Sequence, residues 1–373
     1  MSSHQHERAG RLSRREAIGR MAAGLVVASA FGTETIAGAA QRPAAPARKR
    51  TVQTVLGPID LAKLGFTLSH EHICAASAGM WQAWPELFGG RARFISTTVD
   101  RLKQARDEGV DSLIDVTTVD LGRDIRLLEE VSRRSGLQIV ACTGHWVDPS
   151  RSMNARTVEE LAEFFVREIE RGIEGTDIKA GVIKVANGGT IDPFGDKVLR
   201  AAARASKATG VPITTHSPGA DRVGDKQAAI FESEGLSPSN ACIGHTDNSA
   251  ADYQLGLITR GYYLGMDQLP RGGPAPPGTP LQQAGALTWE QRYAQIKALV
   301  DAGFADRIVL GNDHSIAMSL QPTAADRLRL VQNPDGILFV SRKAIPSLKA
   351  IGISEQAIRT MTVEAPRRFF EGA

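Results

Sequence analysis

From about residue 55 the chain alternates short apolar segments with longer segments of helical spacing, and this alternation limits its fold more than any other feature. The short segments are 65–73, 111–118, 137–144, 180–187, 211–217, 241–247, 262–267 and 307–313. Between them, apolar residues recur at intervals of about 3.6, most clearly in 125–136, 158–175, 196–210 and 286–303. Eight strands with interleaved helices predict an α/β fold, a (β/α)8 TIM barrel, with no break into two domains.

The start of the chain differs in composition from the rest and predicts export. Arg14 and Arg15 precede an apolar run that is too short and too rich in glycine for a membrane span, and small residues follow it. We interpret residues 1–39 as a twin-arginine signal, 40–53 as a disordered linker and 54–373 as the barrel domain. The alternative is a disordered basic leader. The expected location is the periplasm, with membrane contact only through export or anchoring.

Charge and cysteine content exclude some classes of protein. The net charge is +3, but the basic excess precedes residue 51, and the remainder has no basic stripe that would indicate nucleic-acid binding. The three cysteines, Cys74, Cys142 and Cys242, are odd in number and cannot all pair within one chain. A protein that folds before export fits this pattern.

Side chains of the types that bind metals stand at the ends of the predicted strands. They are His70 and His72 on the first strand, Lys184 on the fourth, His216 on the fifth, His245 on the sixth and Asp313 on the eighth. The carboxyl ends of barrel strands face one shared cavity, where the chemistry of this fold takes place. One such histidine is usually structural, but this many at the same end indicate a metal site.

The spacing of these residues predicts two ions. His70 and His72 are two residues apart, so both side chains point the same way and can share one divalent ion. Asp313 can add an oxygen ligand to that ion, while His216 and His245 on adjacent strands can hold a second. Zinc, cobalt and manganese all suit these ligands.

Lys184 stands inside the apolar strand AGVIKVAN, where a buried ammonium group is costly. One interpretation is an amine that reaches solvent at the mouth of the barrel. The other is reaction with CO₂, which converts the ammonium into an anionic carbamate with two oxygens that can bridge both ions. We favour the carbamate because of the metal ligands that surround it.

Several spaced motifs together resemble the phosphotriesterase family of the amidohydrolase superfamily. They are GFTLSHEHI, GVIKVA, VPITTH, AIFESEGLSPS, CIGHTD and GND, and the similarity runs from about residue 54 to 370. HEHICAASAG, WPELFG and ESEGLSPS make the bacterial organophosphate hydrolases (aryldialkylphosphatases) the nearest branch. The resemblance implies two divalent ions, Zn²⁺ or alternatively Co²⁺ or Mn²⁺, and a carbamylated Lys184 (N6-carboxylysine) that bridges them. His70, His72 and Asp313 would bind one ion, and His216 and His245 the other.

The resemblance also implies a reaction. A hydroxide shared by the two ions would attack neutral aryl dialkyl phosphates and release a dialkyl phosphate and an alcohol or phenol. Asp313 is the candidate to receive the proton. Relatives pass this proton to an aspartate after the sixth strand and then a histidine after the seventh, where this chain has Asn248 and Gln268. Neither amide can carry the proton, although the adjacent Asp247 could substitute.

A substrate pocket is expected around this centre. Its expected lining residues are Ala75, Leu121, Trp146, Gln268, Arg271, His314 and Met318. Trp146 offers an apolar wall or core packing, and His314 a pocket donor or a solvent-facing side chain. Gln268 and Arg271 make the pocket more polar than one built for neutral triesters. The proline- and glycine-rich segment 270–285 predicts a long functional loop.

Two alternatives to a triester hydrolase remain. A lactonase could use the same hydroxide, but lactonase relatives tend to carry a tyrosine after the second strand, and DVTTVDLGRD has none. An exported metal-binding barrel with attenuated catalysis is the other. The expected partner is a small-molecule ester rather than nucleic acid, and a homodimer is common among relatives.

Overall fold

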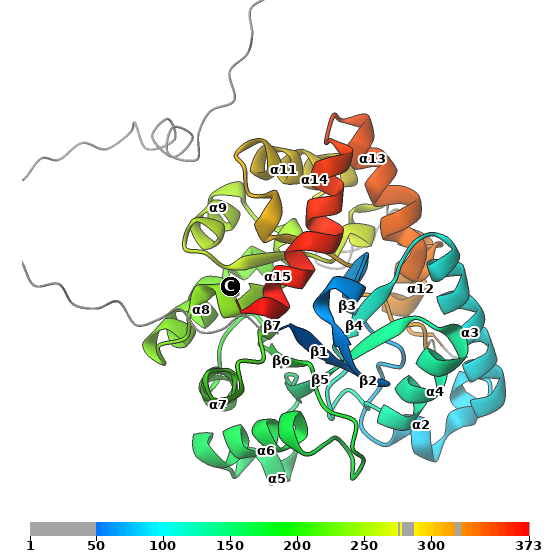
Figure 1. Cartoon of the computed structure of the whole chain (residues 1–373), viewed down its shortest axis with the longest axis vertical. Coiled ribbons are helices and arrows are strands. Elements are labelled where there is room, and N and C mark those ends of the chain that lie inside the picture. Colours follow the sequence, from blue (N-terminus) through cyan, green and yellow to red (C-terminus); the bar gives the residue numbers. More distant parts are fainter. Residues whose placement is uncertain (1–49, 275–276, 278–286, 318–321, 373) are drawn as a thin grey trace, which may run out of the picture.

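The computed structural model describes residues 50–274, 277, 287–317 and 322–372 and confirms the predicted (β/α)8 barrel. Eight parallel strands form one nearly closed sheet in the order β10-β9-β8-β7-β6-β5-β4-β3, and helices surround it (Figure 1). The strands are β3 (Thr67–Glu71), β4 (Ser112–Asp115), β5 (Gln138–His145), β6 (Val182–Ala186), β7 (Ile213–His216), β8 (Ala241–Ile243), β9 (Tyr263–Met266) and β10 (Ile308–Leu310). Each lies within one of the eight predicted segments except β5, which extends one residue further.

The outer helices follow the strands along the chain. They are α2 (Met80–Ala83), α3 (Arg91–Asp107), α4 (Ile125–Ser135), α5 (Arg151–Asn154), α6 (Val158–Glu170), α7 (Pro193–Thr209), α8 (Val223–Ser233), α9 (Ala251–Thr259), α11 (Trp289–Asp301), α12 (Ala324–Gln332), α13 (Ile345–Ala350), α14 (Glu355–Arg359) and α15 (Ala365–Glu371). Caps set several of these bounds. Asp124 accepts a hydrogen bond from the Leu127 N–H at the start of α4, and Gly136 ends it with φ of 74°. Helix α6 ends five residues before the predicted position because Gly172 and Glu174 adopt positive φ.

Side-chain alternation divides the core into two layers. On β6, Ile183 and Val185 pack outward against the helices, whereas Val182 belongs to the cluster inside the barrel. Lys184 therefore faces the barrel interior. Helix α15 contributes Phe369 to the inner cluster and lies across one end of the barrel (Figure 1).

The folded chain begins earlier than expected. Strands β1 (Thr51–Thr54) and β2 (Gly57–Asp60) form an antiparallel hairpin, so residues 51–53 are not part of a linker. Val52 is buried, and the Val55 N–H donates to the Ile139 carbonyl of β5 at 2.9 Å. The expected signal over residues 1–39 and the rest of the linker lie outside the described residues. The described part of the chain contains no helix that is long and apolar enough to span a membrane.

The barrel closes through side chains and loops where β3 meets β10. Ser69 donates to the Leu310 carbonyl at 2.8 Å, and the Asp313 N–H donates to the His70 carbonyl at 2.9 Å. The His72 N–H in turn donates to the His314 carbonyl at 2.9 Å. Closure therefore brings the last candidate ligand, Asp313, beside the first two.

Two π-helical turns near the end of the sequence could not be predicted from the spacing of apolar residues. π-Helical turns η9 (Val340–Ala344) and η10 (Thr360–Glu364) lead into α13 and α15. Pro346 and Pro366 each lie two residues after the end of such a turn, and a proline has no N–H to continue the regular ladder. Of the predicted loop 270–285, the structure describes residues 270–274 and 277, which include most of η6 (Leu269–Gly272).

A buried arginine ties α4 and α6 to the sheet and predicts a large stability effect. The Arg123 guanidinium donates to Glu168, to Glu174 at 3.0 Å and to the Cys142 carbonyl at 2.8 Å. Arg123→Ala leaves these acceptors without their cation and should lower the free energy of unfolding by about 3–5 kcal/mol, measured by urea denaturation. Arg133→Ala, which breaks an exposed pair with Glu129, should change it little. Equal shifts for both variants would contradict this role of Arg123.

Candidate metal centre

The six side chains expected to hold metal converge inside the barrel. His70 Nε2 and His72 Nε2 lie 3.7 and 3.4 Å from Asp313 Oδ1. The Lys184 amine lies 2.8 Å from His70 Nε2. His245 Nε2 lies 2.7 Å from His216 Nδ1. Lys184 is only 1% exposed, which excludes the interpretation that its amine reaches solvent at the mouth of the barrel.

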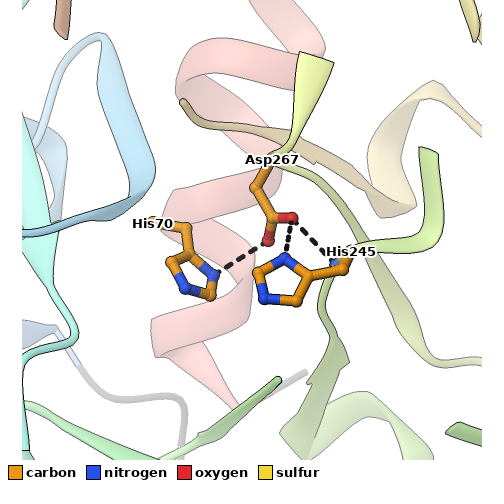
Figure 2. Close-up of side chains that lie close together, drawn as sticks. All are labelled: His70, His245 and Asp267. Atoms are coloured by element: carbon orange, nitrogen blue, oxygen red, sulfur yellow. Dashed lines mark hydrogen bonds and ion pairs between the residues drawn. The ribbon is translucent and has the colours of Figure 1, made fainter. Parts of the chain in front are cut away.

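Asp267 orients two of the imidazoles and was missed by the sequence reasoning. Its two oxygens accept hydrogen bonds from His70 Nδ1 at 2.9 Å and from His245 Nδ1 at 2.8 Å (Figure 2). Both Nε2 atoms are thereby left as lone-pair donors toward the interior. Thr117 Oγ1, 2.9 Å from His72 Nδ1, does the same for the third ring. The signal was available, since Asp267 is the last residue of the predicted seventh strand.

Two groups in the described part of the chain have ligand atoms close enough to share an ion. One is His70, His72 and Asp313, as the sequence predicts. The other is His70, His245 and Asp267. We interpret Asp267 as a partner of the ring N–H groups rather than a ligand, because it engages Nδ1 while Nε2 of the same rings points to Lys184 and His216.

The protonation states fit cation binding. Burial, with the nearby Lys184 charge, lowers the pKa of His70 to about 3, and burial with His245 lowers the pKa of His216 well below its usual value. Both imidazoles are therefore neutral at pH 7, as ligands must be. Burial would raise the pKa of Asp313, but Arg271 and the histidines outweigh it and hold the pKa well below its usual range. Burial also lowers the pKa of Lys184 to about 8.

Two of the expected ligands have strained backbones. His245 has φ of 60° and Asp313 has φ of 46°, a region that costs a residue other than glycine about 1–3 kcal/mol. Asp267 Oδ1 accepts the His245 N–H at 2.8 Å. Buried Glu71 accepts the N–H and the side-chain amide of Asn312 at 2.7 and 2.8 Å, directly before Asp313. These carboxylates hold the strained segments in place, and Glu71 is a second residue that sequence reasoning missed.

The two positions where the resemblance implies a proton relay hold amides with hydrogen bonds of their own. Asp313 Oδ2 accepts from Gln268 Nε2 at 2.8 Å and from Arg271 Nη2. Asn248 Oδ1 accepts the Leu287 N–H at 3.2 Å. Neither Gln268 nor Asn248 supplies an acidic or basic group there.

Asp247 does not substitute for the relay. Its Oδ2 forms a fully buried ion pair with Arg292, and its Oδ1 accepts the Gln268 N–H at 3.1 Å. Both carboxylate oxygens are therefore committed to structural partners, and the suggested substitution is wrong.

A cavity of about 300 Å³ opens onto this centre. Its wall includes five of the expected pocket residues: Ala75, Leu121, Trp146, Arg271 and His314. Gln268 is buried behind it against Asp313, and Met318 lies outside the described residues. The Trp146 ring stands edge-on to the His216 ring at 5.8 Å, so it forms cavity wall rather than core.

Comparison with known proteins agrees with this arrangement. The model of the phosphotriesterase family matches residues 50–370. A phosphotriesterase homology protein of Mycobacterium tuberculosis is 33% identical over 334 residues, which cover 86% of this chain and 97% of that protein. An aryldialkylphosphatase of Saccharolobus solfataricus is 33% identical over 319 residues, with 84% and 96% covered. An N-acetyltaurine hydrolase of Xenopus tropicalis is 26% identical over 355 residues, with 85% and 97% covered. The chain therefore belongs to the phosphotriesterase family of the amidohydrolase superfamily, whose enzymes use a binuclear metal centre.

Proposed function

We propose that this protein is an aryldialkylphosphatase, a hydrolase of neutral organophosphate triesters that uses two divalent ions, Zn²⁺ first among them. The observation that carries the proposal is the Lys184 amine, buried 2.8 Å from His70 Nε2 among neutral imidazoles. A buried ammonium ion is costly at such a position, whereas an anionic ligand that binds metal suits it. The aryldialkylphosphatase among its relatives supports the substrate class.

Carbamylation of Lys184 is chemically reasonable in this setting. The unprotonated amine attacks CO₂, a C–N bond forms and one proton is lost, which leaves a carbamate of charge −1. Burial lowers the pKa of Lys184 to about 8, so part of the amine is unprotonated near neutral pH. Among the described histidines, cysteines and acids, no third residue joins His216 and His245 in a ligand group. The carbamate would supply that ligand.

Different residues would bind each of the two ions and receive the proton. His70, His72 and Asp313 would hold one ion, His216 and His245 the other, and the ions would lower the pKa of a shared water and polarise the phosphoryl oxygen. Asp313 Oδ1 faces the centre and would receive the proton, while Gln268 and Arg271 fix Oδ2. With Asp247 committed to Arg292, the proton would leave Asp313 through the water-accessible cavity.

The alternatives use the same centre. A lactonase is disfavoured because Leu121 and Trp146, rather than a tyrosine after the second strand, line the cavity. A metal-binding protein without turnover is disfavoured by the cavity of about 300 Å³ that opens onto the centre, since metal binding alone needs no such space. The family also includes relatives named for hydrolysis of N-acetyltaurine, so the bond that is cleaved must be tested directly.

Substrate preference and the role of Lys184 as a bridge between the ions can be tested together. The metal-loaded protein should hydrolyse diethyl 4-nitrophenyl phosphate with kcat/KM at least about a hundredfold above that for an aliphatic lactone. Lys184→Ala should lower the metal content below two ions per chain and reduce triester kcat/KM by more than about a hundredfold, beyond the loss typical of outer-shell partners. Metal analysis and steady-state kinetics measure both.

Lys103→Ala, a change of an exposed lysine on α3, is the control and should alter neither quantity. A higher kcat/KM for the lactone would favour the lactonase. Two ions bound without turnover of either ester would favour the metal-binding protein. Full metal content in Lys184→Ala would contradict the bridge.

Asp267 gives a prediction on metal affinity. Asp267→Asn places an amide where two ring N–H groups need acceptors, so affinity for Zn²⁺ should fall about 10–100-fold in competition with a chelator. The number of ions at saturating zinc should stay at two. Asp301→Asn, which affects an exposed pair with Lys297, should leave affinity unchanged. A lower saturating stoichiometry in Asp267→Asn would identify Asp267 as a ligand instead.

We also propose that residues 1–39 direct the folded protein to the periplasm and that it acts there as a homodimer. The twin Arg14 and Arg15 support the export route. Changing both to lysine should shift activity from the osmotic-shock fraction to the cytoplasmic fraction of expressing cells. Unchanged fractionation would contradict this route.

A further inference from the structure

One stretch of the cavity wall, built from η6 and α12, carries two arginines. Arg271 lies on η6 and Arg329 on α12, and both line the cavity that holds the expected metal ligands. The side-chain amide of Gln332 on α12 donates to the Arg271 carbonyl at 3.3 Å, so the two elements are packed together. Burial lowers the pKa of Arg329, and the neighbouring Arg271 charge lowers it further. Two like charges are thus held near each other in one cavity.

Arg329 has little local compensation for its charge. Its ion pair is with Asp326 Oδ1 at 3.6 Å, beyond hydrogen-bond distance. The other oxygen of Asp326 accepts from the N–H and the hydroxyl of Thr323 at 3.0 and 2.8 Å, in the capping box of α12. Within the described ranges, the Arg329 guanidinium has no hydrogen-bond acceptor. The Arg329 side chain is 56% exposed and lines the cavity, so its guanidinium is available to a ligand.

Arg271 has a different primary partner. Its Nη2 donates to Asp313 Oδ2, on the far side of that carboxylate from the oxygen that faces His70 and His72. The Arg271 charge is therefore partly balanced by direct contact with Asp313, whereas Arg329 has only the longer-range attraction of Asp313 and the Asp326 pair at 3.6 Å. A neutral triester would leave both guanidinium groups beside an uncharged ligand.

We infer that Arg329, assisted by Arg271, forms an anion subsite that binds a sulfonate, carboxylate or phosphate group carried by the substrate away from the cleaved bond. Guanidinium groups bind such oxyanions in a planar, two-pronged geometry, which a neutral ester cannot match. This inference rests on the hydrolytic function proposed above for the position of the reacting bond. It adds that, among triesters with an uncharged phosphoryl centre, the preferred ones carry a negative charge on the leaving group or an arm.

A matched pair of substrates tests the subsite. Diethyl 4-sulfonatophenyl phosphate carries the anion, and diethyl 4-(methylsulfonyl)phenyl phosphate is a neutral counterpart of similar shape. The ratio of their kcat/KM values, anionic over neutral, should fall about three- to tenfold in Arg329→Gln, as expected for one partly exposed charge. Arg329→Lys should retain part of the preference. Arg271 is left unchanged because it contacts Asp313.

Arg327→Gln is the matched control. Arg327 lies on the same helix, two residues away, but outside the cavity wall, and it donates to the Pro322 carbonyl. It should leave the ratio unchanged. If Arg327→Gln lowers the ratio as much as Arg329→Gln does, the preference reflects the general field of the protein and the subsite is refuted. An unchanged ratio in Arg329→Gln also refutes it.

Equilibrium binding separates the subsite from the reaction. Isothermal titration calorimetry of the metal-loaded protein should show 4-ethylbenzenesulfonate binding more tightly than 4-ethylphenyl methyl sulfone, with the difference lost in Arg329→Gln and reduced by salt. Sulfonates are weak metal ligands, so the metal centre contributes little. If neither phosphate is hydrolysed, the proposed function fails, while a sulfonate preference that depends on Arg329 still supports the subsite. Equal binding of both probes overturns it.

Discussion

The whole centre depends on how little positive charge the buried side chains inside the barrel can carry. Four imidazoles and the Lys184 amine share this interior with the carboxylates of Asp267 and Asp313. Burial lowers the pKa of His70 to about 3, so this imidazole is neutral at pH 7, and it lowers the pKa of Lys184 to about 8, so part of the amine is unprotonated near neutral pH. The His70 and His72 nitrogens and the Asp313 oxygen that faces them form a site that could hold a metal ion. Asp267 makes it specific by fixing which nitrogen of His70 and His245 faces inward.

The hydrogen bonds that close the barrel also fix the positions of the metal-ligand side chains. The Asp313 N–H bonds the first strand at the His70 carbonyl, and Glu71 accepts from Asn312 on the same seam. The pairing of β3 with β4 shifts register between Leu68 and Glu71. As a result Leu68 points outward to the helices, whereas His70, two residues later, points into the barrel. The strained backbone of Asp313 is thus held by bonds that also close the sheet. Loosening this seam would disturb the ligands before it disturbed the core.

The sequence predicted what depends on periodicity and on residue type at strand ends. All eight barrel strands and the six converging side chains follow from these two signals, because strand ends of a barrel face one cavity. Long-range partners could not be read in this way. Glu71 points between two strands joined only by closure, and the Asp247–Arg292 pair links positions 45 residues apart. Residues 51–53 of β1 fall within the predicted linker, because a four-residue strand after a basic, proline-rich stretch carries little pattern of its own.

The departures from relatives point in one direction. With Gln268 and Arg271 both donating to Asp313 Oδ2, this carboxylate is held by groups that orient it and cannot take its proton. Arg292 removes Asp247 from the same chemistry, since a fully buried ion pair exchanges its proton only at the cost of an unpaired buried charge. The side of the cavity where the resemblance implies a proton relay therefore carries fixed positive charge in this chain. With the anion subsite proposed above, this wall would hold the substrate rather than transfer a proton, and Arg329 on α12 lines the same cavity.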